Sequence, residues 1–191
     1  MVFIAQTEFL DFEEELVKEM EAWMVENKRA FDEEVPRWLL LKFRVGVPTC
    51  ERCFIELQEH LVWRRTELPI QVSERTSQVI ESGFIYVHGR DWRFRPAFVI
   101  DPLKTDHLKT LMSKEDLEDA VIKTTCFVLE YLISNCMLPG QIENWVTIIN
   151  VNKQGVMSID RNSLKKVIAV ASANYRCRPK KTFIVNTTTA V

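Results

Sequence analysis

The chain has 191 residues, of which 47% are hydrophobic, and its formal net charge is −2. This length allows one sizeable core, or one domain with a smaller helical attachment. The charge offers no basic face for nucleic acid, and no hydrophobic run reaches the ~20 residues of a membrane span. Its five scattered cysteines favour a reducing compartment and free thiols over a disulfide framework. The first residues do not resemble a signal peptide, so we expect a cytoplasmic protein.

Three helices are predicted in residues 1–72. The first, over 7–29, combines an apolar stripe with carboxylates concentrated in its first half, where the helix dipole favours negative charge. The second and third are predicted over 36–46 and 49–65, and Pro69 ends this part of the chain. The pattern therefore predicts an all-helical N-terminal module.

Alternating helices and strands are predicted in residues 73–191. A short helix over 74–81 precedes two strands, 84–87 and 97–101, that are joined by a turn. Ser113 then starts a capping box, which predicts a long helix that continues to Met137.

The last fifty residues predict a β-α-β unit. Residues 146–151 form a hydrophobic run typical of a strand buried on both faces. A helix over 163–174 and a second strand over 183–185 complete the unit, whose crossover should be right-handed. The predicted fold class is α/β, with the helical N-terminal module followed by a mostly parallel sheet and flanking helices.

Five short motifs run through the chain in a fixed order. They are LLLKFR at 39–44, LVWRR at 61–65, GRDWRFRP at 89–96, TIINV at 147–151, and NYRCR followed by TFIVN within 174–186. Their order and spacing resemble the CRAL-TRIO family of lipid-binding and lipid-transfer proteins. The chain departs from the family pattern at Leu41, Phe94, Asn150, Arg176 and Cys177. Because Phe94 stands where the family has a turn glycine, we expect the 89–96 turn to be reshaped.

The resemblance implies a lipid-binding or lipid-transfer protein that holds a hydrophobic ligand between sheet and helices and exchanges it with membranes. The implied partners are a phospholipid or another hydrophobic lipid and, transiently, a membrane surface, with no cofactor. The candidate lipid-binding residues are Phe98, Ile100, Ile148, Val151, Val167, Ala171, Tyr175, Arg178 and Val185. The hydrophobic members of this set equally fit an ordinary core between sheet and helices.

No catalytic pattern is present in the sequence. There is no Gly-rich phosphate loop, no nucleophile motif and no pair of catalytic carboxylates, so we do not expect an enzyme. Cys50 and Cys53 have the spacing of a metal-binding pair, but they lie in a predicted helix without a second pair. The alternative function is a membrane-peripheral interaction or regulatory scaffold that has lost the lipid pocket.

Two further expectations follow from the resemblance. Cys177 stands where members that bind phosphatidylinositol have a glutamate, and a thiol is a poor acceptor, so we expect weak phosphatidylinositol transfer. In the family, further strands and a mobile helix follow the strand that ends at Asn186. Without them after Val191 the lipid-binding domain would be truncated and one side of its sheet would be open. Two explanations fit: the chain is a fragment of a longer protein, or it closes its open side by forming a homodimer. We expect an isolated monomer to be unable to retain a lipid.

Overall fold

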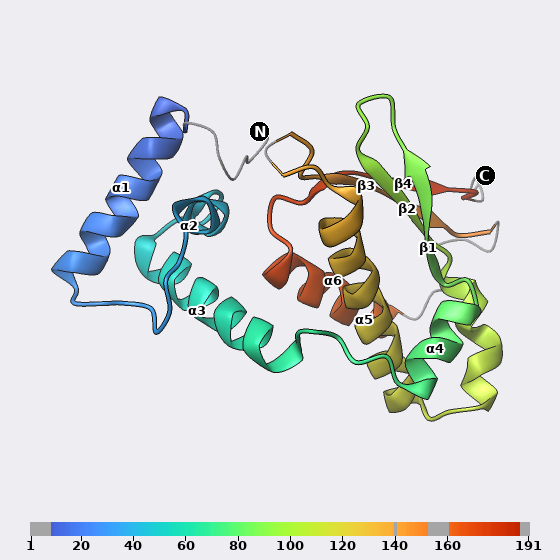
Figure 1. Cartoon of the computed structure of the whole chain (residues 1–191). Coiled ribbons are helices and arrows are strands. Elements are labelled where there is room, and N and C mark those ends of the chain that lie inside the picture. The colour runs from blue at the N-terminus through green and yellow to red at the C-terminus, as the bar shows by residue number, and fades with distance from the viewer. Residues whose placement is uncertain (1–8, 140, 153–160, 188–191) are drawn as a thin grey trace. The chain divides into compact units, whose positions relative to one another are not determined.

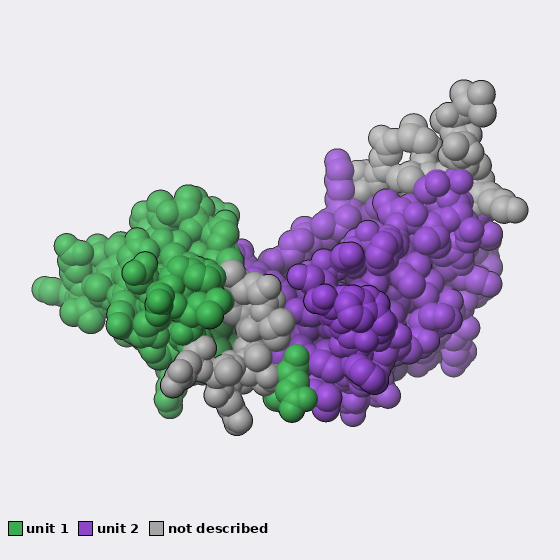
Figure 2. All heavy atoms as spheres, turned by 90° about the horizontal axis from the view of Figure 1, so that it is seen from above, with its two compact units in different colours: residues 1–68, 139–141 green, residues 69–138, 142–191 purple. Residues whose placement is uncertain are grey.

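The computed structural model divides the chain into two compact units, coloured separately in Figure 2. The described residues are 9–139, 141–152 and 161–187. The first unit comprises residues 1–68 and 139–141, and the second comprises 69–138 and 142–191. Helices are the regular elements described in the first unit, whereas the second combines helices with a sheet. The predicted α/β fold class is therefore confirmed.

The first unit contains helices α1 (Asp11–Glu26), α2 (Arg37–Arg44) and α3 (Cys50–Glu67). The start of the first predicted helix, residues 7 and 8, lies outside the described residues. The buried guanidinium of Arg44 lies 2.6 Å from a carboxylate oxygen of Glu19, which ties α2 to α1. The hydrophobic core of this unit includes Val17, Met20, Leu41, Phe43, Cys53 and Leu57.

The second unit is built on a four-stranded sheet in the order β1-β2-β3-β4 (Figure 1). Strand β1 is antiparallel to β2, whereas β2, β3 and β4 run parallel to one another. Because right-handed crossovers between successive parallel neighbours place their helices on the same side, α5 and α6 lie together on one face. The elements are α4 (Glu74–Glu81), β1 (Ile85–Arg90), β2 (Pro96–Ile100), η1 (Pro102–Thr110), α5 (Lys114–Tyr131), η2 (Leu132–Cys136), β3 (Trp145–Asn150), α6 (Arg161–Asn174) and β4 (Pro179–Val185).

Three of the differences from the sequence prediction have a physical reason. The 3₁₀ helix η1 was not predicted, because its apolar residues lack the 3.6-residue period of an α-helix. Helix α5 ends at Tyr131 and continues as a π-helical turn, short of the predicted end. Strand β4 begins at Pro179 and is exposed along its whole length, so its first, polar residues gave no signal of burial.

The predicted burial of β3 on both faces holds for only part of the strand. Its first half, Trp145 to Thr147, is buried, but Ile148 to Asn150 is half-buried.

The tip of the β1–β2 hairpin is organised by Asp91. Its Oδ1 accepts hydrogen bonds from the backbone N–H groups of Arg93 and Arg95, both at 2.9 Å, and its Oδ2 accepts from Arg95 Nε at 2.8 Å. Phe94 has φ +59°, so it adopts the left-handed conformation that glycine reaches without strain. At Phe94, where the family has a glycine, the turn thus keeps a backbone conformation that suits glycine.

The pKa of Asp91 reflects this arrangement. Burial acts to raise it, but the hydrogen bonds from the Arg95 side chain and from the backbone of Arg95 and Arg93 outweigh burial and lower it below its usual value. The ionised carboxylate therefore stabilises the folded hairpin.

We predict that Asp91→Asn lowers the free energy of unfolding by about 2 kcal/mol at neutral pH, because an amide oxygen is a weaker acceptor for these donors. A lowered folded-state pKa gives stabilisation that is present above the unfolded pKa of about 4 and is lost as pH falls through the folded value. Urea unfolding at several pH values measures the difference. The control Asp119→Asn removes an exposed carboxylate and should change stability by less than about 0.5 kcal/mol. A difference independent of pH would contradict the role given to Asp91.

Candidate functional site

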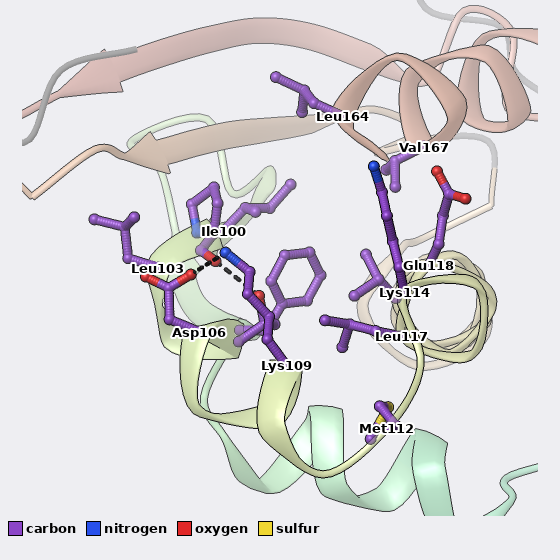
Figure 3. A pocket seen from close by; sticks show the side chains of 14 residues that line it. Ile100, Leu103, Asp106, Lys109, Met112, Lys114, Leu117, Glu118, Leu164 and Val167 are labelled. Atoms are coloured by element: carbon purple, nitrogen blue, oxygen red, sulfur yellow. Dashed lines mark hydrogen bonds and ion pairs between the residues drawn. The ribbon is translucent and has the colours of Figure 1, made fainter. Parts of the chain in front are cut away.

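An apolar cavity of about 330 Å³ lies in the second unit, between η1, α5, α6 and the end of β2 (Figure 3). Its volume is at the lower end of the range of about 300–1,000 Å³ for ligand pockets. The lining residues are Phe84, Ile100, Pro102, Leu103, Thr105, Asp106, Lys109, Met112, Lys114, Leu117, Glu118, Val121, Leu164 and Val167.

Secondary-structure spacing supplies the apolar walls. Ile100 is the last residue of β2 and contributes from the sheet. Leu117 and Val121 are four residues apart on α5, and Leu164 and Val167 are three apart on α6, so each pair lies on one helix face. The cavity is therefore formed by elements that are distant in the sequence and meet on one side of the sheet.

Charged side chains lie on two sides of the cavity (Figure 3). On one side, Lys109 Nζ lies 2.5 Å from Asp106 Oδ1. On the other, Glu118 stands beside Lys114, and its Oε2 accepts a hydrogen bond from Lys166 Nζ at 2.6 Å. Glu118 is only 9% exposed, and its second oxygen, Oε1, is buried without a hydrogen-bond partner among the described residues. One residue of the cavity wall thus carries a buried acceptor whose hydrogen bonding is incomplete.

Three of the predicted lipid-binding residues lie at or near this cavity. Ile100 and Val167 line it. Ala171 lines a narrow gap between α5 and α6 that has no room for a water-sized molecule.

Phe98 and Tyr175 lie in the hydrophobic core on the helix side of the sheet. Both rings contact Trp145, with centroid distances of 6.0 and 6.1 Å. The Tyr175 hydroxyl points at the carbonyl oxygen of Cys126 at 3.5 Å, and burial, followed by the neighbouring Cys126 and Glu130, raises the pKa of this tyrosine. These two aromatic residues pack α5 and α6 onto the sheet.

Arg178 connects the start of β4 to the segment before β3. Its Nη1 donates to the carbonyl oxygen of Glu143 at 2.9 Å and lies 3.6 Å from the Glu143 carboxylate. Cys177, just before it, has φ +59°. Val151, which follows β3, is fully buried at 1% exposure. Neither Arg178 nor Val151 lines the cavity.

Ile148 and Val185 lie on the sheet face that points away from the cavity. Ile148 is in register with Val99 and Phe183, so the three side chains share a face, and alternation places Ile100 on the opposite one. Phe183 is 48% and Val185 37% exposed. This face therefore carries exposed hydrophobic side chains on β4, and the homodimer expected through it stays a prediction.

The carboxyl ends of the three parallel strands are joined by polar side chains. Asn150, at the end of β3, donates from Nδ2 to Asp101 Oδ2 at 3.0 Å and accepts from Asn186 Nδ2 at 2.8 Å through its Oδ1. Asp101 is buried, and its Oδ1 has no partner among the described residues. An amide at position 150, where the family has an acid, can donate to Asp101 as a carboxylate cannot.

The described residues do not bring three metal-ligating side chains together. Among the same described residues, no helix is long and hydrophobic enough to cross a membrane. Cys50 and Cys53 are both buried on α3, and neither of them forms a disulfide.

Comparisons with known proteins bear on this fold and cavity. A family model described as the CRAL/TRIO domain matches residues 80–191. The chain belongs to the CRAL-TRIO family. The predicted family assignment is thereby confirmed for the part of the chain that contains the cavity.

Solved structures support the CRAL-TRIO fold. The crystal structure of Sfh5 superposes with a TM-score of 0.65 at 14% sequence identity, over 96% of this chain and 74% of that one. In all, 24 chains of solved structures match significantly. A search of curated protein sequences found no significant match.

Sequence reasoning missed most of the cavity wall of this CRAL-TRIO domain. Leu103 lies on helix η1, which the sequence did not predict. The sequence pattern assigns Leu117 and Val121 to the apolar stripe of α5 and gives no sign that they line a ligand site. Glu118 adjoins that stripe, and only its burial distinguishes it from a surface carboxylate. A usable signal was the Asp101–Pro102 break directly after β2, since ligands of parallel sheets bind beyond the carboxyl ends of strands.

We predict that Asn150→Asp lowers the free energy of unfolding by about 2 kcal/mol at neutral pH, because two carboxylates would then face each other at hydrogen-bond distance. The repulsion raises the pKa of one carboxyl group in the folded state, so the loss should be largest above that pKa and shrink as pH falls and a proton is shared. Chemical unfolding between about pH 5 and 8 tests this. Asn152→Asp adds the same charge at an exposed side chain and should have little effect. Equal effects of the two substitutions would show that the Asp101 contact does not matter.

Proposed function

We propose that this CRAL-TRIO domain is a carrier that holds a hydrophobic lipid in the cavity between η1, α5, α6 and β2, and exchanges it with membranes. The observation that carries the proposal is an apolar cavity of about 330 Å³ in the family-matched part of the chain. Each buried CH₂ contributes roughly 0.8 kcal/mol, so about eight methylene groups would contribute about 6 kcal/mol before ordering costs. Membership of the CRAL-TRIO family supports a lipid as the ligand and a carrier rather than an enzyme.

The polar groups of the cavity favour a lipid that donates a hydrogen bond. Glu118 Oε1 is a buried acceptor without a partner among the described residues, and a ligand hydroxyl or amine would satisfy it. A phosphodiester group has no such donor and could not satisfy this oxygen. We therefore place long-chain alcohols and other hydroxyl-bearing lipids ahead of phosphatidylcholine, whose headgroup has no donor. The weak phosphatidylinositol transfer that we expect rests separately on the loss of the family glutamate at Cys177.

We predict that Leu103→Trp, which fills the cavity from η1, weakens lipid binding by at least about tenfold. Calorimetry of the purified full-length chain with a long-chain alcohol, and mass spectrometry of lipid extracted from it, measure the effect. Leu111→Trp, at a 66% exposed position just after η1, is the matched control and should bind like the wild type. Wild-type protein that carries no extractable lipid and binds no alcohol would refute the carrier proposal and favour the interaction scaffold.

We predict that the wild type prefers a long-chain alcohol over the methyl ether of the same alcohol by about tenfold, because the ether cannot donate to Glu118. Glu118→Leu should reduce this ratio to near one, whereas Glu118→Gln, which retains an acceptor oxygen, should keep part of it. Glu115→Leu changes an exposed carboxylate one turn away and serves as the control. An alcohol preference unchanged in Glu118→Leu would show that another group selects the ligand.

A further inference from the structure

Two large aromatic side chains are exposed at the tip of the β1–β2 hairpin. Trp92 is 79% and Phe94 68% exposed, and the described structure gives neither of them a covering hydrophobic neighbour. The hairpin extends beyond the body of the sheet in Figure 1. A protruding pair of exposed aromatic residues is unusual on a soluble domain and indicates an interaction surface.

The tip is also cationic. The Arg93 guanidinium lies 4.4 Å from the centroid of the Trp92 ring, and Arg90 Nη1 donates to the carbonyl oxygen of Phe94 at 2.7 Å. The carboxylate of the tip, Asp91, is already paired with Arg95 inside the turn. Arg90 and Arg93 therefore give the tip a net positive charge.

Positive charge continues along the same end of the sheet. The strand registers place Gly89, Ala97, Val146 and Lys181 in one row across the four strands. At roughly 4.8 Å per strand, Lys181 lies about 14 Å from the hairpin strand. Lys180 and Lys181 are both exposed, so basic side chains occur at both edges of this end.

We propose that the β1–β2 hairpin tip docks this protein on anionic membranes. Trp92 and Phe94 would enter the interface between headgroups and acyl chains, where aromatic rings are favoured, while Arg90 and Arg93 meet anionic headgroups. The Asp91 hydrogen bonds hold the turn in place, so little conformational entropy is lost on docking. With only two inserting side chains, docking should be reversible, as a carrier requires.

A membrane fits these features better than a nucleic acid or a protein groove. The whole chain has a net charge of −2, so attraction to an anion must be local to this surface. Side by side, the exposed aromatic rings and the arginines match the aromatic and basic composition of membrane-interface segments. The proposal does not depend on which ligand fills the cavity.

Flotation of the full-length chain with phosphatidylcholine vesicles, with and without phosphatidylserine, tests the proposal. The wild type should bind the anionic vesicles at least about tenfold more tightly than the neutral ones. The double variant Trp92→Ala, Phe94→Ala should lose about tenfold on anionic vesicles, and Arg93→Glu should remove most of the preference for phosphatidylserine. Leu111→Ala and Lys104→Glu, at exposed positions outside the hairpin, are the matched controls and should bind like the wild type.

Thermal unfolding and alcohol binding separate docking from folding and from the carrier proposal. Both should be unchanged in the hairpin variants, because the substituted side chains are exposed and do not line the cavity. The proposal is overturned if the wild type ignores both kinds of vesicle, if the hairpin variants bind like the wild type, or if the hairpin binds oligonucleotides and not vesicles. If Leu103→Trp loses alcohol binding but still binds vesicles, then the hairpin docks on membranes independently of the cavity.

Discussion

The parallel pairing of β3 with both β2 and β4 is the constraint on which the second unit depends. It fixes the crossover helices α5 and α6 on one face and brings the carboxyl ends of the three strands together. There, Asn150 links Asp101 to Asn186, so one amide satisfies polar groups from both neighbouring strands. On the helix side, Trp145 contacts Phe98 and Tyr175 and packs the helices against the sheet.

The cavity is a consequence of this arrangement. The aromatic contacts fill the space between helices and sheet near the amino end of β3, whereas near the end of β2 the smaller Ile100 and the helix η1 leave space. A void lined by hydrophobic side chains loses dispersion contacts, and a hydrophobic ligand would restore them. The buried Glu118 Oε1 adds an unsatisfied acceptor to the same wall, and both deficits can be relieved by one amphipathic molecule.

The two ends of the sheet present different chemistry. The carboxyl ends of the strands adjoin the cavity and the polar link through Asn150, while the hairpin end carries exposed aromatic and basic side chains. A carrier needs both a protected site for its ligand and a surface that meets the membrane. Their separation allows substitutions at Leu103 and at Trp92 to test the proposed lipid binding and the proposed membrane docking independently.

The sequence by itself determined the α-helices, the β-α-β unit and the family, because hydrophobic period, capping residues and motif order are local properties. Ser113, for example, caps α5 as its capping box predicts, accepting from the backbone N–H of Asp116. Only the tertiary structure decided which hydrophobic residues line the cavity and which fill the core. Ile100 and Phe98 are two residues apart on one strand face, yet the first lines the cavity and the second packs on Trp145. Likewise, Glu118 is buried and bonded to Lys166 on α6, a contact between distant segments that no local pattern encodes.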